Sequence, residues 1–184
     1  VWGGLRTLDD IRTVLSAGAD KISINSQAIH DKKFVKKAVQ EFGSSTISCQ
    51  IQVQKKIDGN YYCFYENGRQ ETQLNPLDWA QELQNLGVGE ITITFINSDG
   101  TGNGFDKNLI INLRKILHIP LVVAGGIGNK EQVLDAFSLD VDGVSVSSSF
   151  HYYYLKKNLK YIQSEEYSEG NLDYIYNMDS NINE

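Results

Sequence analysis

The chain has 184 residues, of which 41% are hydrophobic and 22% charged, a composition typical of a globular domain. Its formal net charge of −6 argues against a nucleic-acid surface, and no apolar run reaches the roughly 20 residues that cross a bilayer. Cys49 and Cys63 form neither a metal-binding pattern nor a disulfide framework, so we expect a cytoplasmic protein without a metal ion or cofactor.

Helix and strand patterns alternate along the first half of the chain. A helix capped by Thr7 precedes a short strand at residues 21–25, and a helix capped by Asp31 precedes a strand at residues 46–53. The polar stretch over residues 55–73 contains one Asp-Gly and one Asn-Gly dipeptide. Both dipeptides favour tight turns, so we expect a small β-hairpin excursion there.

The same alternation continues through the second half. Three more helices are expected, each beginning after a residue whose side chain can accept a hydrogen bond from a free backbone N–H: Asn75, Asp106 and Asn129. Three strands are expected between and after them, at residues 90–96, 119–124 and 141–146. Strands that alternate with helices at this spacing predict parallel βαβ units.

These elements predict an α/β fold, an incomplete (β/α)8 TIM barrel that contains about strands 3 to 8. Roughly six strands are expected, counting a strand end at Val1 and Trp2, whereas eight close a barrel. We therefore expect that upstream sequence is missing or lies on another chain, and that two open sheet edges favour self-association. The barrel domain is predicted over residues 1–160, followed by a loosely ordered polar tail over residues 161–184.

Glycines and small polar residues recur where predicted strands give way to helices. They form five clusters: Gly3 and Gly4; Asn25 and Ser26; Asp99, Gly100 and Thr101; Gly125 and Gly126; and Ser147 and Ser148. In a barrel these loops share the face at the C-terminal strand ends, where backbone N–H groups and helix N-termini hold phosphates. Tight turns alone explain any single glycine pair, but the early and late clusters together suit a ligand with a phosphate at each end.

The clusters and their neighbours resemble the HisF family, the cyclase subunit of imidazole glycerol phosphate synthase. The resemblance runs in register from residue 1 to about residue 151, through residues 1–7, 18–26, 87–91, 99–106, 124–128 and 150–151. It implies a barrel of the HisA/HisF type. Within the family, residues 66–68 followed by residues 75–80 are similar to the WbuZ branch, which is associated with amidation of surface sugars.

The resemblance implies a reaction in histidine biosynthesis and a partner. Members of the family take ammonia from a glutamine amidotransferase docked on the N-terminal face of the barrel, and use it on a bis-phosphorylated ribulosyl substrate. By position, one phosphate would be held by Gly3, Gly4, Asn25 and Ser26. The other would be held by Asp99, Gly100, Gly125, Gly126, Ser147 and Ser148, with Asp99 also a candidate catalytic residue. Asp20 and Lys21 match the face where ammonia enters, although an ordinary exposed ion pair explains them equally well.

The sequence departs from the family where protons are transferred. The family uses two aspartates as general acid and base; one lies on a first strand that this sequence lacks, and the other corresponds to Gln52. An amide cannot exchange a proton as a carboxylate does, and losing one such group costs roughly 10²–10⁴-fold in rate. Asn97 also replaces an expected aspartate, and Trp2 replaces a glycine beside one phosphate loop.

Other side chains with possible chemistry have simpler structural explanations. The three histidines (His30, His118 and His151) form no metal-binding pattern, so we interpret them as structural. Cys49 lies on a strand and is expected in the core. The three tyrosines of residues 152–154 are expected to pack the final helix onto the barrel, the alternative being a surface for a partner.

Two functions of different classes are compatible with these residues. The first is an enzyme subunit of the HisF family that acts with a glutaminase. The second is a non-catalytic module that binds a bisphosphate or activates a glutaminase, which Gln52 favours. A truncated gene product without independent activity is a third reading.

Overall fold

The structure is a computed structural model that describes residues 3–162. Val1, Trp2 and residues 163–184 lie outside the described residues. The expectations for the strand end at Val1 and Trp2, for a bulky ring beside one phosphate loop and for the polar tail therefore stay predictions.

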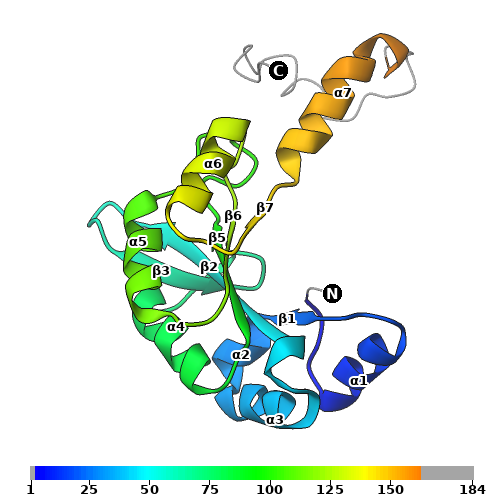
Figure 1. Cartoon of the computed structure of the whole chain (residues 1–184), viewed down its shortest axis with the longest axis vertical. Coiled ribbons are helices and arrows are strands. Elements are labelled where there is room, and N and C mark those ends of the chain that lie inside the picture. Colours follow the sequence, from blue (N-terminus) through cyan, green and yellow to red (C-terminus); the bar gives the residue numbers. More distant parts are fainter. Residues whose placement is uncertain (1–2, 163–184) are drawn as a thin grey trace.

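Seven strands form a single curved sheet in the described part of the chain (Figure 1). Five of them run parallel: β1 (Ile22–Ile24), β2 (Ile47–Lys55), β5 (Glu90–Phe95), β6 (Leu121–Ala124) and β7 (Gly143–Ser145). The other two, β3 (Tyr61–Tyr65) and β4 (Gln70–Glu71), are antiparallel. The sheet order is β4-β3-β2-β5-β6-β7, and β1 also pairs with β2. The predicted α/β fold is confirmed, as an incomplete barrel of parallel βαβ units.

Strand β2 organises the sheet because it pairs along both of its edges. One edge pairs with β5 over residues 48–53. The other edge is divided: residues 47–49 pair with β1, and residues 52–55 pair with β3. The predicted hairpin excursion over residues 55–73 is therefore present, and it extends the sheet beyond the end of β1.

Within residues 3–162 seven α-helices accompany the strands, and five of them begin at a residue that caps the helix through its side chain. They are α1 (Leu8–Ser16), α2 (Ser26–His30), α3 (Lys32–Phe42), α4 (Pro76–Asn85), α5 (Lys107–Ile116), α6 (Lys130–Ser138) and α7 (Ser148–Ile162). Each predicted cap accepts a backbone N–H of its helix: Thr7, Asp31, Asn75, Asp106 and Asn129. Helix α2 was not predicted, since it has only five residues and no side-chain cap. In Figure 1, α3, α4 and α5 follow the outside of the curved sheet, as barrel helices do.

The two faces of the sheet differ in chemistry. Side chains alternate along a strand, so Cys49, Ile51 and Val53 of β2 share one face with Ile91 and Ile93 of β5, and all five are buried. Burial raises the pKa of the Cys49 thiol to about 12, so Cys49 is a core residue, as predicted.

The opposite face of the same strands is polar. It carries Ser48, Gln50 and Gln52 on β2, paired in register with residues of β5 that include Thr92 and Thr94. The Gln50 amide donates to the Thr94 hydroxyl at 2.9 Å, and the Ser48 hydroxyl donates to a carbonyl of β1. The concave interior of the incomplete barrel is therefore lined by hydrogen-bonding groups that lead toward the C-terminal strand ends.

The prediction that the final helix packs onto the barrel through its tyrosines is wrong for Tyr153 and Tyr154, whereas Tyr152 is half-buried and its hydroxyl lies near Gly100. The exposed fractions of Tyr153 and Tyr154 are 53% and 65%, and Phe150 beside them is 70% exposed. Figure 1 shows α7 extending away from the sheet. The first turn of α7 still contacts the sheet loops, since the Ser149 hydroxyl donates to the Ile127 carbonyl.

Candidate functional site

Two adjoining cavities lie where the parallel strands end. One, of about 390 Å³, is lined by the early glycine loop and the end of β1, and we call it the early cavity. The other, of about 400 Å³, is lined by the ends of β5, β6 and β7 and the loops that follow them, and we call it the late cavity. Every residue predicted to hold a phosphate lines one of the two, and none of the early set mixes with the late set.

The early cavity contains Gly3, Gly4, Asn25 and Ser26, the residues predicted to hold one phosphate, and their binding of phosphate stays a prediction. Gly4 has a φ of +77°, a left-handed backbone conformation that glycine adopts without strain, and a side chain added there would meet no atom within 4 Å. The glycine therefore leaves its backbone open to the cavity, and no packing constraint requires it.

The late cavity contains the residues predicted to hold the other phosphate, a role that stays a prediction: Asp99, Gly100, Gly125, Gly126, Ser147 and Ser148. Here packing explains one glycine directly. A Cβ on Gly126 would lie 2.0 Å from the Gly104 carbonyl oxygen, so only glycine fits. The start of α7 at Ser148 also borders this cavity, and the first backbone N–H groups of a helix have no intrahelical acceptor.

Three residues line both cavities and so form the wall between them: Gln50, Gln52 and Asn67. The Gln52 side-chain oxygen accepts hydrogen bonds at 3.0 Å from the Asn25 amide and at 3.0 Å from the backbone N–H of Gly68. The Asn25 amide also donates to the Phe64 carbonyl at 3.2 Å. The backbone N–H of Gly68 can only donate and the Phe64 carbonyl can only accept. These two backbone groups therefore fix the orientation of the Gln52 and Asn25 side-chain amides.

These hydrogen bonds leave the Gln52 Nε2 group and the Asn25 Oδ1 atom available to a ligand. No described residue forms a hydrogen bond with the Gln52 Nε2 group, and the buried Asn25 Oδ1 atom has no partner. The Ser23 hydroxyl, which also lines the early cavity, is buried without a partner as well. Buried polar atoms are normally hydrogen-bonded, so unpartnered ones beside a cavity indicate a place for a polar ligand.

Charged groups are few and unevenly distributed. Among residues lining the late cavity Asp99 is the one charged side chain, so an anion there would depend on backbone N–H groups and hydroxyls. The early cavity is lined by Arg6, Glu66 and His30, all exposed. Asn97 lines neither cavity, so its replacement of an expected aspartate does not alter their walls.

Lys21 and Asp20 lie at the opposite end of the strands. The Lys21 Nζ atom is 2.6 Å from a carboxylate oxygen of Glu90, the first residue of β5, and this ion pair spans the N-terminal end of β2. Asp20 is exposed. The ordinary explanation, an ion pair at the start of a strand, therefore holds for Lys21, while a role in docking a partner stays a prediction.

Several residues of the cavity walls were not predicted from the sequence, among them Arg6, His30, Gln50 and Asn67. His30 was interpreted as structural, but it is exposed, lines the early cavity and packs its ring edge against Tyr65 with centroids 5.0 Å apart. His118 and His151 are also exposed. Only strand alternation from Gln52 could have identified Gln50 in advance, because residues two apart share a face.

Comparison with known proteins decides the family. A family model described as histidine biosynthesis protein matches residues 1–156. The chain belongs to the histidine biosynthesis protein family. Imidazole glycerol phosphate synthase subunits HisF from Hydrogenobaculum and Exiguobacterium are each 39% identical to it, over 153 and 151 residues. The predicted resemblance to HisF is thereby confirmed.

The alignments cover most of this chain but a smaller share of each relative. It includes 83% and 82% of this chain but 61% and 58% of the Hydrogenobaculum and Exiguobacterium relatives. The HisF subunit of Saccharolobus solfataricus is 39% identical over 168 residues, 90% of this chain and 66% of that relative. The chain thus spans about three fifths of the length of these relatives.

The described residues also bear on metal binding and on membrane insertion. Within residues 3–162, no three or more His, Cys, Asp or Glu side chains gather as a metal site would require. None of the helices in this part of the chain combines the length and the apolar character needed to span a membrane.

Proposed function

We propose that this family member holds a bis-phosphorylated ligand across its C-terminal face, as part of a HisF-like cyclase that uses ammonia. The observation that carries the proposal is the pair of adjoining cavities, one built from the early loops and one from the late loops, with a common wall at Gln50, Gln52 and Asn67. One phosphate would lie in each cavity. The ribulosyl part of the ligand would cross the wall.

Ammonia would come from a glutamine amidotransferase on the opposite face. The ion pair of Lys21 with Glu90 marks the N-terminal end of the strands, where a glutaminase would dock. The polar interior along β2 and β5 connects that end with the cavities. The similarity of residues 66–68 and 75–80 to the WbuZ branch further favours amidation of a surface sugar as the specialised role.

A second candidate function is binding without turnover, and Gln52 favours it. The side chain at the centre of the site is an amide fixed by two hydrogen bonds, so it cannot take or give a proton during cyclisation. Such a module would hold the bisphosphate, or activate the glutaminase, without converting the ligand.

Thermal stabilisation tests the shared part of both functions. A ligand that binds only the folded state at 100 times its Kd stabilises the protein by roughly 2.7 kcal/mol, and inorganic phosphate at one site would give less. We expect a larger rise in melting temperature with the bis-phosphorylated ribulosyl substrate of the family than with inorganic phosphate. Absence of any shift at about millimolar ligand would contradict bisphosphate binding in both functions.

Turnover then separates the two. The chain would be supplied with the ribulosyl substrate and an ammonium salt while imidazole glycerol phosphate is followed. Substrate binding without product supports the non-catalytic module. Product formation at the rate of a HisF subunit would exclude it.

A further inference from the structure

The tip of the β3–β4 hairpin, Glu66 to Gly68, has an unusual backbone conformation beside both cavities. Glu66 and Asn67 have φ values of 50° and 58°, and Gly68 follows at 77°. Left-handed backbone at two successive non-glycine residues is uncommon, and such conformations persist where the surroundings hold them. Asparagine tolerates this conformation better than most residues, whereas glutamate gains nothing from it.

Three contacts hold the tip against the site. The backbone N–H of Glu66 donates to the Ser26 hydroxyl at 3.0 Å, and the backbone N–H of Gly68 donates to the Gln52 side chain at 3.0 Å. The backbone of Gly68 also lies against Ile96 of the late cavity, because a Cβ built there would be 3.3 Å from the Ile96 side chain. The tip is thus fastened on one side to the early cavity and on the other to the late cavity.

Between these contacts, the Asn67 side chain is available to form hydrogen bonds with a ligand. Asn67 is exposed, lines both cavities, and its amide forms no hydrogen bond with a described residue. It offers one acceptor and two donor hydrogens. The other two residues of the shared wall have partners that limit them: Gln50 donates to Thr94, and Gln52 accepts from Asn25 and Gly68.

We propose that Asn67 determines specificity by forming hydrogen bonds with the polar middle of a bis-phosphorylated ligand, where that ligand passes between the two cavities. This inference rests on the proposed function, since it requires a ligand that spans both. The ligand class it selects has hydroxyl, amide or imine groups between its phosphates. An apolar linker of equal length would gain nothing from Asn67.

The test compares Asn67→Gly with the unaltered chain. Glycine keeps the left-handed backbone and removes only the side chain. Three probes would be titrated by calorimetry: the bis-phosphorylated ribulosyl substrate, an alkanediol bisphosphate of matched length, and inorganic phosphate. We expect Asn67→Gly to weaken the ribulosyl ligand by about 5- to 10-fold, the effect of one or two hydrogen bonds, and to leave the other two probes unchanged.

A matched control is Asn60→Gly, the same substitution at the other turn of the excursion, where Asn60 bonds Asp58 and lines neither cavity. It should leave all three affinities unchanged. Equal weakening of all three probes by Asn67→Gly would overturn the proposal, because the tip would then be structural. No weakening of any probe would also overturn it.

Failure of the proposed function gives a different result. In that case the unaltered chain binds neither the ribulosyl ligand nor the alkanediol bisphosphate, and the proposal for Asn67 falls with it. If the unaltered chain binds both bisphosphates equally well, two-cavity binding stands and specificity through Asn67 is refuted.

Discussion

Gln52 lies in the wall that the two cavities share. Its side-chain oxygen accepts from Asn25 and Gly68. A carboxylate could accept the same two hydrogen bonds, so the surrounding geometry does not require an amide. What the amide removes is a negative charge at the wall between two cavities proposed to hold phosphates.

The first prediction concerns that charge. Gln52→Glu keeps the length and both accepted hydrogen bonds, but places a carboxylate between two phosphates. At about 10 Å and an effective dielectric constant of about 20, unit charges repel by roughly 1.7 kcal/mol, so we expect at least about tenfold weaker binding of a bisphosphate. Calorimetry at low and high salt checks this, since salt should reduce the difference. The control is Gln81→Glu on α4, which lines neither cavity and should change nothing.

The residues of the site could be predicted only where a local motif accompanies them. The glycine and serine loops are visible in the sequence, and all of them reach the cavities. Asn67 could not be placed, because its position depends on the register of β3 with β2 and on where the hairpin tip turns. Register of that kind is fixed by pairing across the sheet, which no local pattern contains.

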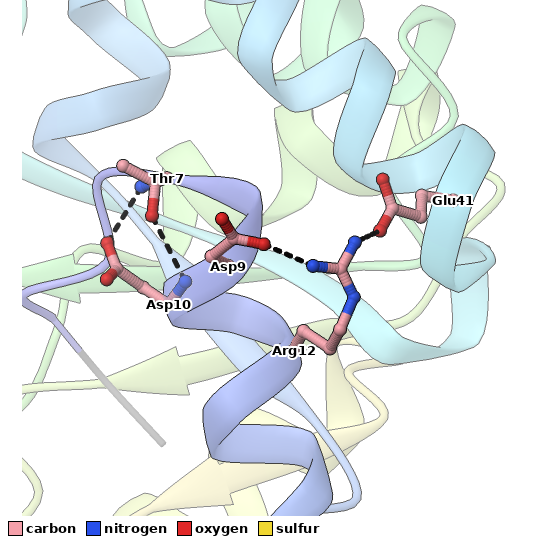
Figure 2. A network of polar contacts seen from close by, with 5 residues as sticks. All are labelled: Thr7, Asp9, Asp10, Arg12 and Glu41. Carbon is pink, nitrogen blue, oxygen red and sulfur yellow. Dashed lines mark hydrogen bonds and ion pairs between the residues drawn. The ribbon is translucent and has the colours of Figure 1, made fainter.

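The start of helix α1 is determined by hydrogen bonds between residues close together in the sequence. The Thr7 hydroxyl accepts from the Asp10 backbone and the Asp10 carboxylate accepts from the Thr7 backbone, which is a capping box (Figure 2). The Asp10 carboxylate also accepts from the Arg6 backbone. On the same helix, Arg12 pairs with Asp9 and with Glu41 of α3. The cap begins the helix, and the ion pair joins it to its neighbour.

Removal of the cap should therefore cost stability. Thr7→Ala loses the hydroxyl that accepts from the Asp10 backbone, and loss of an N-cap costs about 1 kcal/mol. For a chain of this size the melting temperature should fall by about 2–4 °C. Thr13→Ala makes the same chemical change at an exposed position inside α1 and should leave the melting temperature unchanged or raise it slightly. Equal effects of the two substitutions would show that the cap contributes nothing.

The same capping box predicts a dependence on pH. Hydrogen bonds from the backbones of Arg6 and Thr7 lower the pKa of Asp10 from its ordinary value of 3.8. A lowered pKa stabilises the folded state above the unfolded value, and this stabilisation is lost as the pH falls through the folded value. Asp10→Asn should thus melt below the unaltered chain at about pH 6, and the difference should shrink below pH 3.8. A difference independent of pH would assign the effect to packing.

The starts of five helices could be predicted from the sequence because their causes are local. The packing of the last helix, α7, could not. Thr7, Asp31, Asn75, Asp106 and Asn129 each act through atoms a few residues away, so the sequence contains the whole cause. Whether the tyrosines of α7 pack onto the sheet depends instead on the direction in which the helix leaves β7, which is set by contacts far apart in the sequence, such as that of Ser149 with Ile127. No residue of α7 carries that information by itself.

At the scale of the whole molecule, the open sheet is the dominant feature. Among the described strands, β1 pairs only with β2 and β7 pairs only with β6, so each presents an unpaired edge. Beside β7, α6 exposes Leu134 and Phe137, which are three residues apart and share one helix face, with exposed fractions of 58% and 50%. Unpaired backbone groups and apolar side chains at one edge favour pairing with another chain.

We therefore expect self-association that increases with protein concentration, measured by sedimentation velocity. Leu134→Ser with Phe137→Ser removes apolar surface beside the β7 edge and should weaken association by about tenfold or more, because burying one large apolar side chain contributes roughly 1.5–3 kcal/mol. The control is Ile111→Ser, which removes an apolar side chain that is 39% exposed on α5. Because α5 lies between β5 and β6 in the chain and away from the β7 edge, this substitution should not weaken association. A monomer at all concentrations would contradict the expectation. Association that survives the double substitution would assign it to the strand edges alone.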